Sequence, residues 1–331
     1  MGSRLQKMTR SGSLQGVILA AGKGSRLHPI TIKRSKAMLP ILGRPIVERV
    51  MESLHIHGGV RDFILVVSEN DHDIRRYFQE ESSLQVDIQF VVQPQRLGMA
   101  NALACAATAI RGNFILSACD NLVADEHVAD LVAAWHVHPG LDGVISVMRI
   151  GPALLGRTGI VELMDGRVTR IIEKPPPEEA PTNIASLPLY IFTPRLLEYL
   201  PRVQLSPRGE YELQDAIQML IEDGGEIRCV FTEGRLTLTG PEDLLTINRH
   251  YLLTGYGRPQ LAPFTVGPNT HLITPLRIEE GTVIGEGCVI GPRVYIERDC
   301  RIGSNVTIKD AVVLRGAVVE DGAMVVGEVV S

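Results

Sequence analysis

Residues 16–40 read GVILAAGKGSRLHPITIKRSKAMLP, an apolar run that leads directly into a glycine-rich and basic segment. The run from Gly16 to Ala21 has the composition of a strand buried on both faces, as in a parallel sheet. Gly22 and Gly24 then predict a tight loop whose backbone N–H groups can approach an anion. The alternative is a tight glycine turn with solvated lysines. The spacing matches neither a Walker loop nor a dinucleotide-binding fingerprint.

Short apolar runs alternate with helical patterns over the first two thirds of the chain. A helix is expected after Pro45, stopped by Gly58 and Gly59. Further strands are expected at 63–67, 88–93 and 114–119, and an alanine-rich helix at 99–110. This alternation predicts βαβ units and an α/β fold with a mostly parallel sheet over residues 14–254. Ligands of such sheets bind at the carboxyl ends of the strands.

The last seventy residues change character, because an aliphatic residue recurs at every sixth position. The row is Val266, Leu272, Ile278, Ile284, Ile290, Ile296, Ile302, Ile308, Leu314, Glu320 and Val326. A period of six fits neither a helix nor a simple strand, and predicts a left-handed parallel β-helix of hexapeptide repeats over 264–331. About three coils of eighteen residues are expected. Glu320 interrupts the row and predicts an irregular or capping last coil.

Composition narrows the class of protein. The 331 residues are 45% hydrophobic and 21% charged, which is typical of a large globular domain with a smaller one. The net charge of −5 argues against nucleic-acid binding, and no apolar stretch is long enough to cross a membrane. The five scattered cysteines lack C-x-x-C spacing, which favours a reducing, cytoplasmic location. Residues 1–13 are expected to form a disordered leader, and 255–263 a linker.

Three charged residues have the chemistry of a phosphate site. Arg26 offers a planar fork to phosphate oxygens, and Lys36 offers a point charge. Asp120 directly follows an apolar strand, where a carboxylate is well placed to bind Mg²⁺. The alternative for Asp120 is a helix N-cap, since Asn121 and Asp125 also lie where a helix can begin.

The segment from Gly22 to Pro40 resembles the signature G-x-G-x-R-L-x-P-x-T…P-K-x-[ML]-L-P of the sugar-1-phosphate nucleotidylyltransferases. This family includes glucose-1-phosphate thymidylyltransferase and its uridylyl and N-acetylglucosamine-1-phosphate relatives, several of which carry an appended β-helix. The resemblance extends to about Asn248 through Gln93 with Gly98–Ala102, Cys119-Asp120-Asn121, Gly159, Glu173-Lys174-Pro175 and Arg208–Glu212. It implies a Rossmann-like fold of the nucleotide-diphospho-sugar transferase type.

The resemblance also implies a reaction and the residues for it. An NTP, with dTTP or UTP favoured, and a sugar-type 1-phosphate would give an NDP-sugar and pyrophosphate by direct in-line attack. Asp120 would hold the Mg²⁺ cofactor, Arg26 and Lys36 would stabilise the departing pyrophosphate, and Lys174 would hold the acceptor phosphate. The expected nucleotide contacts are Leu19, Ala20, Ala21, Gly22, Lys23, Gly24, Ser25, Gln93 and Gly98. The expected sugar-phosphate contacts are Gly159, Glu173, Lys174 and Ser186. The β-helix would support a homo-oligomer.

Two departures from the family pattern leave a second interpretation open. Thr237 stands where the family has its second metal carboxylate, and no acid lies between Gly234 and Pro241. Ser186 and Pro188 replace an asparagine and a glycine beside the sugar, and proline offers no N–H there. The chain is then either an enzyme with an unusual acceptor, such as a modified sugar or cyclitol phosphate, or a catalytically degenerate regulatory homologue that binds nucleotide or sugar nucleotide. The enzyme is favoured by the four retained charged residues Arg26, Lys36, Asp120 and Lys174.

Overall fold

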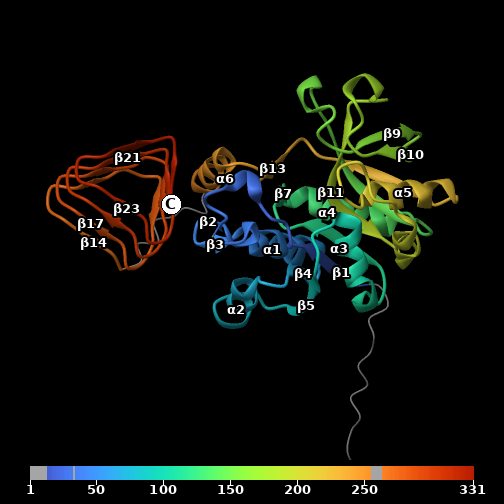
Figure 1. Ribbon diagram of the computed structural model, residues 1–331, viewed down its shortest axis with the longest axis horizontal. Coiled ribbons are helices and arrows are strands. Elements are labelled where there is room, and N and C mark those ends of the chain that lie inside the picture. The colour runs from blue at the N-terminus through green and yellow to red at the C-terminus, as the bar shows by residue number, and fades with distance from the viewer. Residues whose placement is uncertain (1–12, 33, 255–262) are drawn as a thin grey trace, which may run out of the picture. The chain divides into compact units, whose positions relative to one another are not determined.

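The computed structural model describes residues 13–32, 34–254 and 263–331. The contacts within the chain divide it into two compact units (Figure 1). The first comprises the residues up to Ala21 together with Val50–Arg235, and the second comprises Gly22–Arg49 together with Leu236–Ser331. Nearly all of the predicted leader and linker lies outside the described residues. Within the described ranges, no helix combines the length and the apolar character needed to cross a membrane.

A nine-stranded sheet forms the centre of the first unit. From one edge to the other its order is β5 (Asp87–Gln93), β4 (Asp62–Ser68), β1 (Gln15–Leu19), β6 (Phe114–Ala118), β11 (Ile184–Phe192), β8 (Gly143–Arg149), β12 (Ile227–Phe231), β10 (Arg167–Ile172) and β9 (Ile160–Met164). The first four strands are parallel to one another, as their continuous apolar runs predict.

The second half of this sheet corrects the prediction of a mostly parallel sheet. Strand β11 is antiparallel to both β6 and β8, and β10 is antiparallel to β9 and β12. The sheet is therefore mixed. Between β9 and β10, Asp165 and Gly166 have φ of 51° and 76°, which is the geometry of a two-residue hairpin turn. The Asp165-Gly166 dipeptide is the local sequence signal for this hairpin.

Helices cover the sheet of the first unit. They are α2 (His72–Glu80), α3 (Met99–Ala106), α4 (Asp125–Val137) and α5 (Leu213–Glu222). Helix α3 ends four residues earlier than predicted and continues as a 3-10 turn over Ala107–Ala109. The core between helices and sheet includes Phe114, Tyr190 and Phe192, whose side chains are fully buried. Helix α1 (Ile46–Gly58) begins after Pro45 and ends before Gly59, as predicted.

The carboxyl ends of three parallel strands carry predicted site residues. Leu19 pairs with both Ala118 and Val66, and the Cys119 N–H donates to the Leu19 carbonyl at 3.2 Å. The residues that follow β1 and β6 therefore lie at the same edge of the sheet. A short strand, β7 (Asn121–Val123), follows Asp120, and α4 begins only after Ala124. The interpretation of Asp120 as a helix N-cap is therefore wrong.

Three four-stranded parallel sheets make up the C-terminal part of the second unit. The first contains β14 (Thr265–Val266), β17 (Val283–Ile284), β20 (Arg301–Ile302) and β23 (Val318–Val319). The second contains β15 (His271–Leu272), β18 (Val289–Ile290), β21 (Thr307–Lys309) and β24 (Met324–Val326). The third contains β16 (Leu276–Ile278), β19 (Val294–Ile296), β22 (Val312–Val313) and β25 (Val329–Val330). The chain visits the three sheets in turn, which is consistent with a parallel β-helix (Figure 1).

The predicted row of aliphatic residues slips by one residue in the last coil. Ile278 pairs with Ile296, but Ile296 pairs with Val313 and Ile308 pairs with Val325. One residue is missing from the turn around Asp310, so the row continues through valines one position earlier than predicted. Glu320 therefore does not interrupt the stack, because the stacked residue is its neighbour Val319, which is only 5% exposed. The prediction about Glu320 is corrected accordingly.

The second unit also contains the segment that follows the glycine loop. This segment forms a 3-10 turn, η2 (Lys36–Met38), and a small hairpin of β2 (Pro40–Ile41) and β3 (Arg44–Pro45). Helix α6 (Pro241–Leu253) belongs to the same unit. The Asn248 side chain of α6 accepts from the Leu42 N–H at 3.0 Å and donates to the Pro40 carbonyl at 3.2 Å. The hairpin is thus fastened to α6.

Candidate active site

The residues Gly22–Arg26, called the phosphate loop from here on, lie in the second unit. Gly24 has φ of 62°, and a Cβ there would lie 3.0 Å from Lys36 Cβ and 3.2 Å from Thr31 Cγ2. The Thr31 hydroxyl donates to the Gly24 carbonyl at 2.7 Å. Glycine is therefore required at this position, and the structure brings Gly24 and Lys36 together. The side chains of Lys23, Ser25 and Arg26 are exposed, and Gly22 is surrounded by open space.

Gln93 and Gly98 meet in the first unit. The buried Gln93 side chain donates through Nε2 to the Gly98 carbonyl at 3.2 Å and to Asn101 Oδ1 at 2.8 Å. Gly98 has φ of 97°, and a Cβ there would lie 2.6 Å from the Tyr211 carbonyl oxygen. These contacts fix the plane of the Gln93 amide, as a group that reads a base edge requires. Gln93 ends β5 opposite Ser68, at the same sheet edge as Leu19, Ala20 and Ala21.

Asp120 is half-buried after β6, beside a side chain without partners. Neither the Oδ1 nor the Nδ2 atom of Asn121 has a hydrogen-bond partner in the described part of the chain, although the residue is only 4% exposed. An unsatisfied buried amide costs about 1–3 kcal/mol. This arrangement is typical of a site whose ligand completes the hydrogen bonds.

A guanidinium group lies in the electrostatic field of Asp120. Burial lowers the pKa of Arg235, while the charges of Asp120 and the Tyr190 phenol raise it. Arg235 therefore stays protonated, since even a lowered arginine pKa lies far above neutrality. The negative charge of Asp120 is partly balanced before any ligand is present.

Four predicted sugar-phosphate residues, Gly159, Glu173, Lys174 and Ser186, come together as one group, called the acceptor cluster from here on. The Ser186 N–H donates to the Gly159 carbonyl at 2.8 Å, and Lys174 Nζ lies 3.0 Å from Glu173 Oε1. A Cβ on Gly159 would lie 3.1 Å from Glu173 Oε2, so glycine leaves room beside that oxygen. Lys174 has φ of 44°, an uncommon conformation for a residue with a side chain, and such conformations concentrate at functional sites.

One oxygen of the Glu173 carboxylate is available to a ligand. Oε1 faces Lys174 and lies 3.8 Å from the Arg208 guanidinium, whereas buried Oε2 has no partner among the described residues. Burial raises the pKa of Glu173 above its ordinary value, and the charges of Lys174 and Arg208 lower it in part. Arg208 is held in turn by Glu212 at 2.9 Å. The Glu173 carboxylate can accept a hydrogen bond from a ligand hydroxyl through Oε2, while the ammonium group of Lys174 can pair with an anion.

These arrangements can be compared with known proteins. A family model described as "Nucleotidyl transferase" matches residues 15–252, about seven tenths of the chain. The chain belongs to the nucleotidyl transferase family. A second model, described as "GMPPB C-terminal domain", matches residues 272–331. The family assignment therefore rests on the region that holds the glycine loop, Asp120 and the acceptor cluster.

Named relatives of this nucleotidyl transferase family member cover the same region. The chain is 34% identical over 239 residues to the low-salt glycan biosynthesis nucleotidyltransferase Agl11 of Haloferax volcanii, covering 71% of this chain and 65% of that protein. It is 33% identical over 232 residues to the UTP–glucose-1-phosphate uridylyltransferase AglF of the same organism, covering 70% and 93%. The chain thus spans slightly less than two thirds of the first relative's length. A solved structure of UDP-glucose pyrophosphorylase complexed with UDP-glucose superimposes with a TM-score of 0.67, covering 73% of this chain and 100% of that one. At 20% identity, this similarity shows the fold alone.

Pro188 distorts the strand that borders the acceptor cluster of this family member. The pairing of β11 with β8 shifts between Leu187 and Tyr190, so Pro188 lies in a bulge where its missing N–H breaks no regular ladder bond. Beyond the bulge, the Tyr190 hydroxyl and Ser186 Oγ are 2.7 Å apart. The Ser186 hydroxyl of the acceptor cluster is therefore hydrogen-bonded to that of Tyr190.

The sequence assigns no role to three side chains of this site. Arg208 and Tyr190 occur in it only as members of motifs, and Arg235 belongs to none. Arg235 offers a usable signal, because it is the single charged residue between Gly234 and Pro241. Tyr190 offers little beyond its motif, since a tyrosine in an apolar strand is typical of a core residue.

The oxygen donors around Asp120 fit a Mg²⁺ ion that takes few protein ligands. In the described residues, no three His, Cys, Asp or Glu side chains gather as a metal site. Asp120 and the unpartnered Asn121 Oδ1 offer oxygen ligands. Mg²⁺ commonly takes one or two carboxylates and completes its coordination with substrate phosphates and water. The residues therefore fit a metal that arrives together with the nucleotide.

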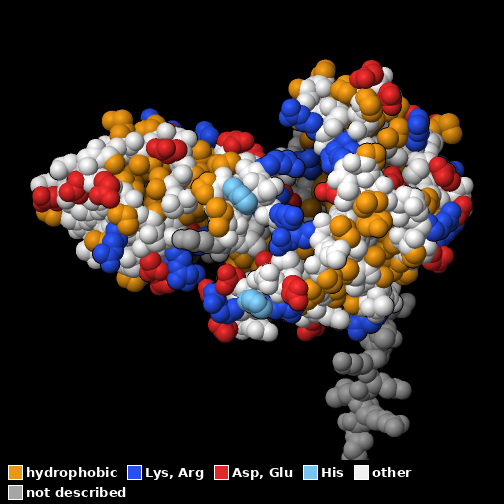
Figure 2. Space-filling view, in the orientation of Figure 1, with side chains coloured by type: hydrophobic (Ala, Val, Ile, Leu, Met, Phe, Trp, Pro, Cys, Tyr) orange, Lys and Arg blue, Asp and Glu red, His pale blue; other side chains and the backbone are white. Residues whose placement is uncertain are grey.

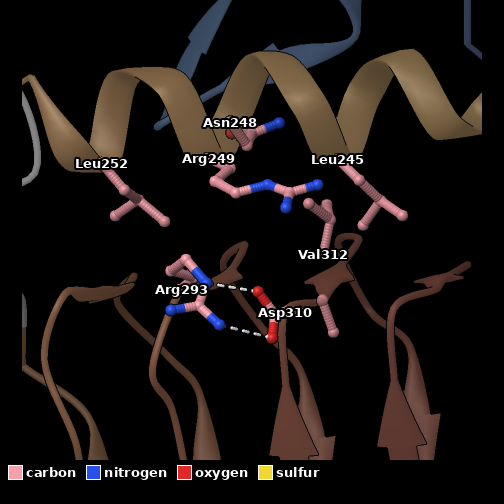
Figure 3. Close-up of a pocket in the computed structure, with 8 residues that line it drawn as sticks. Leu245, Asn248, Arg249, Leu252, Arg293, Asp310 and Val312 are labelled. Atoms are coloured by element: carbon pink, nitrogen blue, oxygen red, sulfur yellow. Dashed lines mark hydrogen bonds and ion pairs between the residues drawn. The ribbon is translucent and has the colours of Figure 1, made fainter.

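A separate small pocket lies in the second unit between α6 and the C-terminal strands (Figure 3). Arg293 forms a two-point ion pair with Asp310 on its floor, and Arg249 of α6 points into it (Figure 3). No predicted site residue lines this pocket. On the face drawn in Figure 2, acidic and basic side chains are interspersed over both units.

Proposed function

We propose that this nucleotidyl transferase family member transfers a nucleoside monophosphate from an NTP to a sugar-type 1-phosphate. The observation that carries the proposal is the acceptor cluster, in which the Glu173 carboxylate pairs with the ammonium of Lys174 through Oε1 and keeps Oε2 without a partner in the described residues. A carboxylate oxygen for a sugar hydroxyl beside a cation for a phosphate is what an acceptor of this class requires. The relatives named as nucleotidyltransferases support the same reaction class.

The chemistry is a direct displacement at the α-phosphorus. An oxygen of the acceptor phosphate attacks, the bond between the α-phosphorus and the bridging oxygen breaks, and pyrophosphate leaves. Lys174 orients the attacking phosphate, and Arg26 and Lys36 neutralise charge on the leaving pyrophosphate. The acceptor phosphate is already an anion, so no general base is needed. A Mg²⁺ held by Asp120 would supply further charge neutralisation at the phosphates when bound.

The nucleotide would be dTTP or UTP. Gln93 is held with its Nε2 turned toward Gly98 and Asn101, which leaves its carbonyl oxygen to accept a base N–H. A pyrimidine with a protonated N3 provides that donor. The AglF relative, named for UTP, supports this choice. The remaining nucleotide contacts are the residues after β1 and the phosphate loop.

The proposal extends to the C-terminal strands and the cellular setting. We assign them as a left-handed β-helix of hexapeptide repeats that supports a homo-oligomer, because the ends of such a stack need covering. All five cysteines are free thiols, three of them buried, which favours a reducing cytoplasm.

Pyrophosphate release tests the proposal. The five common NTPs are offered with Mg²⁺ against a panel of sugar 1-phosphates and cyclitol phosphates. Release with one pair identifies both substrates. Silence with every pair, in a protein that binds nucleotide by calorimetry, contradicts the enzyme.

One observation favours a second candidate, a regulatory homologue that binds nucleotide without turnover. Arg235 balances Asp120, and Thr237 offers a neutral hydroxyl where the family resemblance places a carboxylate. Both features weaken metal binding. Nucleotide binding that is unchanged by EDTA, together with absent pyrophosphate release, supports this candidate.

A further inference from the structure

We propose that the C-terminal β-strands position the phosphate-binding segment of the site, through Glu297 and Tyr295. The inference rests on the proposed function, in which Arg26 and Lys36 bind nucleotide phosphates. The residues between Arg34 and Gly43, which include Lys36, are held at both ends. Glu297, which directly follows β19, binds Arg34, and Tyr295 of β19 binds Gly43.

The first anchor is an ion pair that is largely removed from solvent. Arg34 Nη1 donates to Glu297 Oε2 at 2.9 Å, with the side chain of Glu297 8% exposed and that of Arg34 25%. The same Glu297 oxygen accepts from the Arg315 N–H at 2.8 Å. A carboxylate held by its own strands and paired with a guanidinium is a rigid attachment point. Arg34 lies two residues before Lys36.

The second anchor lies at the hairpin turn after Lys36. The Gly43 N–H donates to the hydroxyl of Tyr295 at 3.1 Å, and Tyr295 is completely buried. Gly43 has φ of 80°, and a Cβ there would overlap Glu279 Oε1. The turn therefore lies directly against the C-terminal strands. Glu297 and Tyr295 are two residues apart at the end of β19, so one strand holds both ends of the segment.

The hairpin end of the segment is also bonded to Asn248 of α6, whereas the η2 turn before it has no side-chain cap. Ser35, the N-cap residue of η2, makes no capping hydrogen bond, and its buried hydroxyl has no partner in the described ranges. A single 3-10 turn without a cap has little intrinsic stability. Its position must come from its neighbours. Because Gly24 lies close to Lys36, the two anchors also influence the position of the phosphate loop.

A charge-removing substitution with a matched control tests the inference. Glu297→Gln keeps an oxygen for the Arg315 N–H but removes the charge that holds Arg34. We expect the Kd of the NTP, measured by calorimetry, to rise about tenfold, and the KM of the NTP to rise with it. The KM of the sugar 1-phosphate should not change. The control is Asp299→Asn, which breaks the Asp299–Arg315 ion pair of 3.3 Å between neighbouring turns of the C-terminal coils and should leave both constants unchanged.

The partner residue separates positioning from general destabilisation. Arg34→Met should weaken NTP binding as much as Glu297→Gln, and the double variant should be no worse than either single one. Tyr295→Phe, which removes one neutral hydrogen bond, should weaken binding about threefold. Equal NTP affinity in wild type, Glu297→Gln and Arg34→Met overturns the inference while leaving the proposed function in place. A wild-type protein that binds no NTP overturns the proposed function and the positioning role with it.

Discussion

The acceptor cluster and the phosphate loop differ in how their side chains are held. In the acceptor cluster, Glu173 pairs with Lys174 and Arg208, and the Ser186 N–H is bonded to Gly159. In the phosphate loop, Gly24 is fixed by Thr31, but the side chains of Lys23, Ser25 and Arg26 extend into solvent. One region is organised before any ligand binds, whereas the other presents exposed cations from a fixed turn.

This difference indicates how the two regions contribute to recognition. A preorganised cluster discriminates between acceptors, because a wrong hydroxyl leaves a buried carboxylate oxygen unpaired. Exposed cations recognise the phosphates that all NTPs share and lose side-chain entropy only when the nucleotide binds. Substitutions in the two regions should therefore have different signatures. Those in the loop should lower NTP affinity and kcat/KM, whereas those in the cluster should change pH dependence and stability.

The largest effect is expected at Asp120, which serves both substrates in the proposed mechanism. Asp120→Ala should lower the rate of pyrophosphate release by at least about 1000-fold, because it removes the predicted metal carboxylate. Asp125→Ala is the matched control, since that carboxylate accepts from Ser53 at 2.8 Å and has no proposed role in the reaction. Turnover within tenfold of wild type in Asp120→Ala would remove the metal assignment.

The next largest effect tests the phosphate loop by itself. Arg26→Ala should lower kcat/KM for the NTP about 100-fold, because it removes a bidentate partner of the leaving pyrophosphate. Stability should change by no more than about 0.5 kcal/mol, as is usual for an exposed side chain. Arg76→Ala, at an exposed arginine of α2, is the control for the loss of a positive charge. A loss of thermal stability with unchanged kcat/KM would mean that the loop is structural.

A pH profile tests the acceptor cluster. Because burial raises the pKa of Glu173, the folded protein holds this proton more tightly than the unfolded chain does. The free energy of unfolding should therefore fall as the pH rises from the ordinary value of 4.5 through the raised pKa. Over the same pH range the KM for the acceptor should fall as the Glu173 carboxylate ionises. Glu173→Gln should raise that KM about tenfold at neutral pH and flatten both profiles.

An unchanged pH dependence of KM in Glu173→Gln would contradict the role of Glu173 as the hydroxyl acceptor. Glu162→Gln is a suitable control. Its carboxylate pairs with Arg170 at 3.6 Å on the outer strands, outside the acceptor cluster. The comparison between cluster and loop predicts that Arg26→Ala will leave both pH profiles as they are in the wild type.

Local patterns in the sequence predicted the elements well where one signal dominated. Apolar runs marked β1, β4, β5 and β6, and Pro45 and Gly59 bracket α1. The repeat region shows how a strong pattern can still mislead. Val313-Leu314 and Val325-Val326 are pairs of neighbouring aliphatic residues, so a row drawn through either register remains mostly apolar. The missing residue at Asp310 became apparent only through the strand pairing.

Short sequence motifs predict which residues form the site, but they do not predict which distant charged residues lie next to one another. Gly159, Glu173, Lys174 and Ser186 were proposed together from short motifs, and the fold does bring them together. The proximity of Arg235 to Asp120 joins residues more than a hundred positions apart, and no local pattern reports such a pair. The attachment of Arg34 to Glu297 is of the same kind. Long-range partners of charged groups depend on the topology, which the sequence specified only in part.

The smallest expected effect concerns the charge that Asp120 already faces. Asp120 resembles the acceptor cluster in having a residue of opposite charge nearby before a ligand binds, because Arg235 lies in its electrostatic field. Arg235→Gln removes a positive charge from the field of Asp120, so Mn²⁺ should bind the free protein about threefold to fivefold more tightly. Arg149→Gln is the control, since that guanidinium stacks on Phe231. Paramagnetic relaxation of water protons measures the affinity without turnover. If Mn²⁺ affinity is unchanged, Arg235 does not compete for Asp120, and the weak donor set alone accounts for any low metal affinity. If affinity rises and pyrophosphate release rises with it at limiting metal, the arginine restrains the metal site, and the regulatory candidate loses its main support.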